Sequence, residues 1–349
     1  MADLGLVGSE EPTAVGGHRP AASLIEGETQ PGGSLTLSAS TWMTLFNEDR
    51  FHALNLRQGQ RVVRAEVREE TGRLVGSLGG VLDKDILTCG YSAPFGGLDL
   101  ARERETPANV ARIVDEALAL LYAQDARALR VKLPPACYGE SEPLVQFTLL
   151  NRGFRVERCE LNQHIALDAL SGPSAYVEQL KSPARRALSK LLAGEFSFRR
   201  AETEAEWDRA YATLAANRAM KGRELSLSRA YIARARQTLG ESVRMYELLC
   251  SERAIAAALV YRVRPRRDLV VAWGDGEHDL ERSPMNLLAY RLVESSLSEG
   301  VRTLDLGISN EHEPGPHGAL EPNAGLVQFK QSVLARIEPR LTLVRELAQ

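Results

Sequence analysis

The sequence of 349 residues has a formal net charge of −3, with 44% hydrophobic and 26% charged residues. This length leaves room for two globular domains, and the small net charge argues against a protein that coats nucleic acid with its whole surface. No apolar run approaches the ~20 residues that cross a bilayer, and the first residues have no apolar segment typical of a secretory signal. The four cysteines form no CxxC pair, which favours reduced thiols over disulfides or a zinc site. We therefore expect a cytoplasmic protein without a membrane span.

The first part of the chain divides into a leader and a first domain. Residues 1–40 are rich in Gly, Pro, Ser, Thr and Ala without a sustained period, which predicts a disordered leader. A first α/β domain is expected over residues 41–172: a hairpin, a strand, a helix over 107–123, a strand, a second helix, and a strand pair over 155–167. The glycines of PFGGLDL (94–100) indicate a tight turn or, alternatively, a bulge or a close approach to a ligand.

A second domain is expected over residues 173–349. It begins with a long helix that Pro183 is predicted to kink or split. One strand, two helices and three strands follow, and then a helix that Ser283 caps and Gly300 ends. A strand over 302–306, a long loop, another helix and a final strand complete the order.

The two predicted domains repeat the same order of elements. The tetrapeptide LVQF opens a helix at Leu144–Phe147 and again at Leu326–Phe329, each time after a strand and a loop. The next residue is Thr148 in the first copy and Lys330 in the second. We infer a duplication in which only the second copy keeps a charged group. Because ligands bind where a helix N-terminus meets the ends of neighbouring strands, the site is predicted beside Gly307.

Four segments carry a resemblance to a known family: PFGGLDL (94–100), LKSPARRALSKLLAGEF (180–196), SPMNLLAYRLVESSLSEGVRTLDLGIS (283–309) and NAGLVQFK (323–330). In this order they resemble the FemAB-like branch of the GNAT acyltransferase superfamily. The resemblance implies an α/β (α+β) fold of two tandem GNAT-like domains, each a mixed, mostly antiparallel sheet flanked by helices, with the active site in the second. It also implies acyl-CoA or aminoacyl-tRNA as the acyl donor and an amine as the acceptor. In the best-known relatives the acceptor is a peptidoglycan precursor.

The sequence departs from the wider superfamily at the donor-binding loop. It has no Gln/Arg-x-x-Gly-x-Gly/Ala segment, with which ordinary acetyltransferases hold the pyrophosphate of coenzyme A. The equivalent place reads GDGEHDLER, and its Asp275, Glu277, Asp279 and Glu281 would repel a pyrophosphate at the following helix end. This argues against ordinary acetyl-CoA binding there.

Acyl transfer to an amine needs donors for the oxyanion of the tetrahedral intermediate and a group that takes a proton. The resemblance implies that Lys330, in the FK pair, faces the acyl carbonyl; the alternative is a solvated lysine on a surface helix. Asp305 alternates with two core leucines and is predicted to accept a proton from the acceptor or to orient Lys330. Alternatively, Asp305 pairs with an arginine and has only a structural role.

Further residues are predicted to contact the substrate. Asn286 and Asn323 have amides that suit an acyl or amide group, although asparagines in such places also cap helices and turns. Trp273 and Phe329 are predicted to border the cleft next to Gly307; the alternative for the tryptophan is simple core packing.

Basic residues are a candidate for phosphate recognition. Lys181, Arg185, Arg186 and Lys190 fall at near-helical spacing and form a ridge, while Lys221 with Arg223 and the arginines of 262–267 form two further clusters. Such patches bind tRNA or nucleotide-sugar phosphates, or are only solvated faces. The Glu and His residues of 311–317 lie in a Pro-Gly loop that fixes no ligand spacing, so no metal is predicted.

We therefore expect an N-acyltransferase or aminoacyltransferase that acts by direct attack of an amine acceptor, small molecule or peptide, with tRNA as a candidate partner. The alternative is a non-catalytic protein with a degenerate GNAT fold that binds RNA or a cell-wall precursor. The sequence distinguishes neither the donor nor the acceptor, and it leaves the oligomeric state open.

Overall fold

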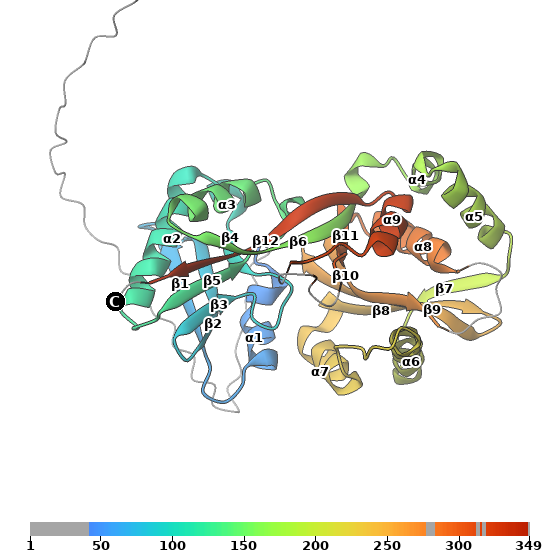
Figure 1. Ribbon diagram of the computed structural model, residues 1–349, viewed down its shortest axis with the longest axis horizontal. Coiled ribbons are helices and arrows are strands. Elements are labelled where there is room, and N and C mark those ends of the chain that lie inside the picture. Colours follow the sequence, from blue (N-terminus) through green and yellow to red (C-terminus); the bar gives the residue numbers. More distant parts are fainter. Residues whose placement is uncertain (1–41, 277–282, 312–314, 316–318, 348–349) are drawn as a thin grey trace, which may run out of the picture.

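The computed structural model describes residues 42–276, 283–311, 315 and 319–347 (Figure 1). The predicted leader and most of the acidic stretch around Glu277 lie outside these residues. The described elements form one mixed sheet of twelve strands with helices on its faces. Within the described residues, no helix has the length and apolar character that a bilayer span requires.

The first half contains strands β1 to β6 and helices α1 to α3. Their bounds are α1 (Asp49–Asn55), β1 (Arg61–Arg68), β2 (Leu74–Asp83), β3 (Ile86–Cys89), β4 (Gly97–Leu100), α2 (Pro107–Tyr122), β5 (Ala128–Lys132), α3 (Glu142–Asn151) and β6 (Arg155–Ala166). Short 3-10 turns η1 (Leu45–Asn47) and η3 (Ala136–Tyr138) lie before α1 and before α3.

The second half contains the remaining helices and strands. Their bounds are α4 (Pro173–Gln179), α5 (Ser182–Leu192), β7 (Phe196–Arg200), α6 (Glu204–Met220), α7 (Arg229–Leu239), β8 (Val243–Cys250), β9 (Arg253–Arg264), β10 (Arg267–Asp275), α8 (Met285–Ser298), β11 (Thr303–Ile308), α9 (Ala324–Ser332) and β12 (Arg336–Glu346). Helices α4, α5, α8 and α9 lie on one side of the sheet and α6 and α7 on the other (Figure 1).

Local sequence signals account for most of these elements. The predicted long helix is split at Pro183 into α4 and α5, as expected from a missing N–H in a helix interior. The predicted strand pair over 155–167 is wrong, because those residues form the single strand β6. Within PFGGLDL, residues Gly97–Leu100 form strand β4 on β2, and the backbone of Gly96 lies so close to Gly90 that no side chain would fit.

The last strand of each half pairs with the sheet of the other half. The order is β1-β2-β3-β5-β12-β6-β11-β10-β9-β8-β7, so β12 lies beside β5, and β6 lies beside β11 (Figure 1). Among the strand pairs of the described residues, β3·β5 and β10·β11 are parallel and the others are antiparallel. The fold class predicted from the sequence is confirmed. The domain boundary at 172/173 stays a prediction, and β12 completes the sheet of the first half across it.

Corresponding positions of the two halves meet in the sheet. The offset in residue number that relates Phe147 on α3 to Phe329 on α9 also relates Cys159 on β6 to Leu341 on β12. Cys159 and Leu341 are opposite each other in the β6·β12 ladder. Strands β6 and β12, which are equivalent in the two halves, therefore pair at equivalent positions. This is the arrangement expected of a duplicated unit with exchanged strands.

A buried ion cluster joins the two halves. Arg264, at the end of β9, reaches into the first half, where it pairs with Asp99 at 3.1 Å and Glu142 at 2.7 Å. Asp99 also accepts hydrogen bonds from Thr44 and Asn47 of the segment before α1. Around this cluster, residues of η1 and α1 share a hydrophobic core with α6, α7 and strands β8 to β10. The relative placement of the halves thus depends on both ionic and apolar contacts.

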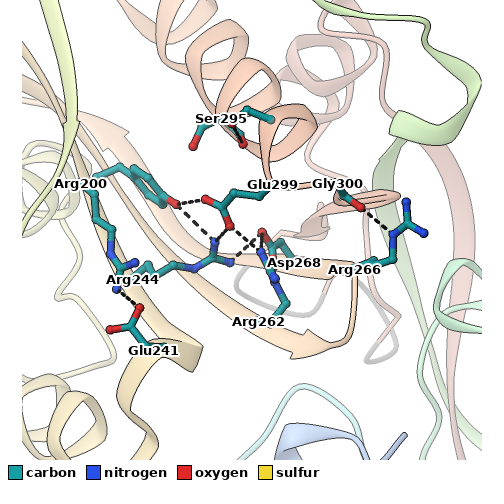
Figure 2. A network of polar contacts seen from close by, with 11 residues as sticks. Arg200, Glu241, Arg244, Arg262, Arg266, Asp268, Ser295, Glu299 and Gly300 are labelled. Atoms are coloured by element: carbon teal, nitrogen blue, oxygen red, sulfur yellow. Dashed lines mark hydrogen bonds and ion pairs between the residues drawn. The ribbon is translucent and has the colours of Figure 1, made fainter. Parts of the chain in front are cut away.

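A second ion network ties the end of α8 to the sheet (Figure 2). Arg244 on β8 pairs with Asp268 and with Glu299, each at 2.7 Å, and its side chain is only 4% exposed. Arg262 contacts the same two carboxylates, and Tyr246 contacts Glu299. Arginines near 262–267 are therefore largely used inside the fold, which favours the structural alternative for that cluster.

Candidate active site

Strands β10 and β11 separate at the place where the site is predicted. Their parallel pairing stops at Leu269 and Asp305, although β10 continues to Asp275 and β11 to Ile308. Opposite β6, the register of β11 shifts between Asp305 and Ile308, and Gly307 in this bulge has φ +72°. Glycine adopts this left-handed conformation without the cost of a side chain. The backbone groups of the bulge therefore lie beyond the end of the β10·β11 ladder.

The side chain of Asp305 forms a hydrogen bond with the backbone of this bulge. Its side chain is fully buried, and one carboxylate oxygen accepts from the Gly307 amide at 2.8 Å and from Asn162 Nδ2 at 2.9 Å. The other oxygen accepts from Tyr138 Oη at 3.0 Å. Burial raises the pKa of Asp305. The carboxylate is thus placed to fix the backbone of the bulge, and its assignment as a proton acceptor stays a prediction.

Lys330 approaches the bulge from α9. Its side chain is buried, and Nζ donates to the carbonyl oxygens of Gly307 at 2.8 Å and Ile308 at 2.9 Å. Burial lowers the pKa of Lys330 to about 7, while the negative charge of Asp305 acts in the opposite direction. The alternative of a solvated surface lysine is wrong. An ammonium has three donors, so one remains beyond the two carbonyl contacts.

The equivalent position in the first half is Thr148 on α3. It is also buried, but its hydroxyl donates to the carbonyl of Leu144 one turn earlier in the same helix. Phe147, equivalent to Phe329, is 64% exposed. The first half therefore lacks the cation at this place, and its aromatic ring is exposed where Phe329 is partly buried.

The other predicted contact residues differ in what they do. Trp273 and Phe329 lie with ring centroids 5.5 Å apart beside the separating strands, and Trp273 is part of the core. Asn323 accepts from the Leu326 amide at 2.8 Å, so it is the N-cap of α9, in agreement with the capping alternative. Asn286 lies half-buried in the first turn of α8, and its side chain has no hydrogen-bond partner among the described residues. Substrate contacts of these residues stay predictions.

The basic ridge is exposed on α5, as predicted. Lys181, Arg185 and Arg186 are all exposed, and none of them forms an ion pair with another described residue. Arg185 has one long contact, 3.5 Å, to the carbonyl of Glu178. The geometry is compatible with phosphate binding and with a solvated face alike.

A second basic group lies nearer to the separating strands. Arg218, Lys221 and Arg223 follow one another at the end of α6. Lys221 donates to Asn217 Oδ1 at 3.2 Å, and Asn217 Nδ2 donates to the carbonyl of Asp275, the last residue of β10, at 2.7 Å. Burial lowers the pKa of Arg218 and of Lys221, and the neighbouring cations lower both further. This group places positive charge beside the end of β10.

A large cavity lies elsewhere, between the halves at the start of β10 and β11. It has a volume of about 1260 Å³, and arginines, acidic residues and Tyr138 are among the residues that line it. The Tyr138 hydroxyl also donates to Asp305, so Tyr138 lies between the cavity and the bulge of β11. Sequence patterns did not indicate Tyr138 or Asn162, because nothing in their local sequence shows that they converge on Asp305.

The acidic loop that follows β10 lies mostly outside the described residues, as do His312, Glu313 and His317 of the predicted metal-free loop. Elsewhere the structure brings together Cys137, His164 and Glu338, whose ligand atoms all lie within 4.8 Å of one another. These residues are too far apart in sequence to form a recognisable motif.

Comparisons with known proteins agree with this arrangement. Residues 179–314 match the family model described as the acetyltransferase (GNAT) domain. This segment runs from the end of α4 to beyond β11, so the match lies in the second half of the chain. A comparison with curated protein sequences gives no match.

Two solved structures show how far the fold extends. The crystal structure of FemX matches 87% of this chain and 92% of its own chain, with a TM-score of 0.67 and 10% sequence identity. The C-terminal domain (DUF2156) of a putative lysylphosphatidylglycerol synthetase from Agrobacterium fabrum matches 80% of this chain and 84% of its own, with a TM-score of 0.51 and 13% identity. At such identities the similarity is one of fold. The GNAT match over 179–314 agrees with the superfamily part of the predicted resemblance, and the FemX comparison adds a shared fold.

Proposed function

We propose that the protein is an N-acyltransferase or aminoacyltransferase whose reaction takes place where β10 and β11 separate. The observation that carries this proposal is the buried ammonium of Lys330, held by the carbonyls of Gly307 and Ile308. A fixed cation at a strand end is the arrangement that stabilises an oxyanion without reorganisation during the reaction. The GNAT match over 179–314 and the FemX-like fold support the reaction class.

In the proposed reaction the neutral nitrogen of the acceptor amine attacks the acyl carbonyl carbon. A nitrogen–carbon bond forms, the carbonyl oxygen gains negative charge, and the third N–H of Lys330 donates to it. Collapse of this intermediate breaks the bond to the leaving oxygen or sulfur, which takes up a proton, while the amine loses one. Asp305 acts in this scheme by fixing the bulge, because its oxygens already accept three hydrogen bonds.

The donor is inferred to be a phosphate-bearing molecule, acyl-CoA or aminoacyl-tRNA. Arg218, Lys221 and Arg223 offer cations next to the end of β10, where the acidic loop replaces the usual pyrophosphate segment. A site that takes phosphates through these side chains needs no glycine-rich loop. The exposed ridge on α5 adds positive charge of the kind that a long RNA would contact.

A transfer assay separates these donors. The purified protein is incubated with labelled acyl-CoAs or with charged tRNAs and a panel of amine acceptors, and the amide product is measured. Ribonuclease treatment should abolish transfer from a tRNA donor and leave transfer from acyl-CoA unchanged. If neither donor is used at any acceptor while the protein binds RNA or nucleotide sugars saturably, the non-catalytic alternative replaces this proposal.

A further inference from the structure

A cluster of potential metal ligands lies at the junction of the two exchanged strands. We call Cys137, His164 and Glu338 the junction cluster. Cys137 lies in η3, His164 on β6 and Glu338 on β12. The cluster therefore contains one residue from a short turn of the first half and one residue from each of the two exchanged strands, β6 and β12.

The sheet register explains why two of these side chains meet. His164 is opposite Arg336, and Glu338 is opposite Asn162, in the antiparallel β6·β12 ladder. Residues two apart on a strand point to the same face, so His164 and Glu338 are diagonal neighbours on one face. Cys137 covers this face from η3, and its backbone amide donates to Glu338 Oε2 at 3.2 Å.

The ligand atoms converge at a place of low exposure. His164 Nδ1 and Glu338 Oε1 form an ion pair at 2.6 Å, and their side chains are only 13% and 12% exposed. An imidazole, a carboxylate and a thiol brought together in this way are a donor set that suits a metal ion, which would replace the ion pair. The second carboxylate oxygen is already held by the Cys137 amide, as is common for a metal-binding carboxylate.

We propose that the junction cluster binds a zinc ion. Thiolate, imidazole and carboxylate are all zinc ligands, with metal–ligand distances of about 2.0–2.3 Å, so ligand atoms around one ion lie within about 4 Å of each other. The observed separations, all within 4.8 Å, allow one ion to contact the three atoms after small side-chain adjustments. Three protein ligands leave the fourth position of a tetrahedral ion for water.

The ion would connect parts of the fold that position the candidate active site. His164 is opposite Asp305 in the β6·β11 ladder, and Cys137 directly precedes Tyr138, which donates to Asp305. Zinc at the junction cluster therefore fixes η3, β6 and β12 relative to one another. This assignment is independent of the acyl donor and of the proposed reaction.

Metal binding to the intact chain tests the proposal directly. The chelator-treated protein is titrated with Co²⁺ and with Zn²⁺, bound metal is measured by mass spectrometry after dialysis, and the thiolate-to-cobalt charge-transfer absorption is recorded. We expect one ion per chain, the charge-transfer band, and a rise in Tm with Zn²⁺ as for any ligand of the native state.

Variants assign the ion to its ligands. Cys137→Ser and Glu338→Gln should weaken zinc binding at least tenfold, and Cys137→Ser should also abolish the charge-transfer band. Cys159→Ser is the matched control. Cys159 is an exposed cysteine on β6, the strand that carries His164, and its replacement should leave zinc binding and the charge-transfer band unchanged. Each variant is compared with the chelated wild type for its Tm, which identifies misfolding. A wild-type protein that binds no Zn²⁺ at micromolar concentration, or a band that survives in Cys137→Ser, overturns the proposal.

Discussion

The ammonium of Lys330 lies 2.8 Å from the carbonyl oxygen of Gly307, so a charge carried by α9 is fixed against the bulge of β11. The same bulge is held from the other side by the carboxylate of Asp305, which accepts from the Gly307 amide. One glycine therefore connects the two residues that the sequence singled out as catalytic. Asp305 accepts from the amide of this glycine and Lys330 donates to its carbonyl oxygen, so one residue joins the two contacts.

Removal of the Lys330 ammonium tests its role in the reaction. Lys330→Met should lower kcat about 10²–10³-fold, the usual loss for one oxyanion donor, with a much smaller change in KM. Steady-state kinetics with the donor found active in the transfer assay give both values. Lys84→Met, in the exposed turn between β2 and β3, should have wild-type kinetics. An unchanged kcat in Lys330→Met would remove the assigned role.

Burial of Lys330 also predicts a pH dependence of stability. Its pKa falls from 10.5 to about 7 on folding, so between these values the unfolded chain binds more protons than the native protein. The free energy of unfolding should therefore rise with pH across this range because of Lys330, and the cost is present in full below pH 7. Relative to Lys330→Met, the wild type should gain stability from pH 7 to pH 10. Urea unfolding at several pH values measures this difference, and a difference that is constant with pH contradicts it.

The positive φ of Gly307 should matter for activity beyond its cost in stability. Gly307→Ala places a side chain in a left-handed conformation, which costs on the order of 1 kcal/mol and distorts the carbonyls that hold Lys330. Gly72→Ala is the matched control. Gly72 has a similar φ of +82° and lies in the turn before β2 with open space around it. Both variants should lose similar Tm, whereas only Gly307→Ala should lose kcat. Equal kinetics in the two variants would show that the bulge has no catalytic role.

The ion cluster between the halves should dominate their docking. Arg264→Met leaves the buried carboxylates of Asp99 and Glu142 without their cation, and breaking such a pair costs about 3–5 kcal/mol. Thermal unfolding should show a large loss of Tm. Combining Arg264→Met with Asp99→Asn and Glu142→Gln should recover part of it, since neutral side chains are cheaper to bury. A triple variant less stable than Arg264→Met would contradict this account.

The two basic groups make separate predictions if the donor is tRNA. Arg223→Glu, near the end of β10, should raise KM for acyl-CoA and for aminoacyl-tRNA alike. Arg186→Glu, on the α5 ridge, should weaken only tRNA binding and reduce its salt dependence by about one unit of slope. Filter binding at several salt concentrations measures the slope. Lys84→Glu serves as an exposed control, and equal effects of Lys84→Glu and Arg186→Glu would assign the ridge to solvent.

The sequence predicted the elements around the site better than the contacts within it. Pro183 and Asn323 act locally, at the break between two helices and at a helix end, so short-range patterns were sufficient to find them. The prediction of Ser283 as the N-cap of α8 is wrong by one residue, because the N-cap is Pro284, although the Met285 amide donates to the Ser283 hydroxyl. Tyr138 in η3 and Asn162 on β6 contact Asp305 through the tertiary fold, in which β6 pairs with β11, so their local sequence does not reveal them. The burial of Lys330 likewise depends on tertiary packing, which an amphipathic pattern on α9 does not reveal.

The exchange of β6 and β12 determines when, during translation, the sheet of the first half can be completed. Strand β5 finds its inner neighbour only in β12, which is translated after nearly all the rest of the described chain. While the ribosome is still making the second half, the first half has an open edge at β5 that invites incorrect pairing. Newly made chains should thus depend on chaperones until translation reaches β12, and a fragment lacking this strand should aggregate rather than fold as an independent module.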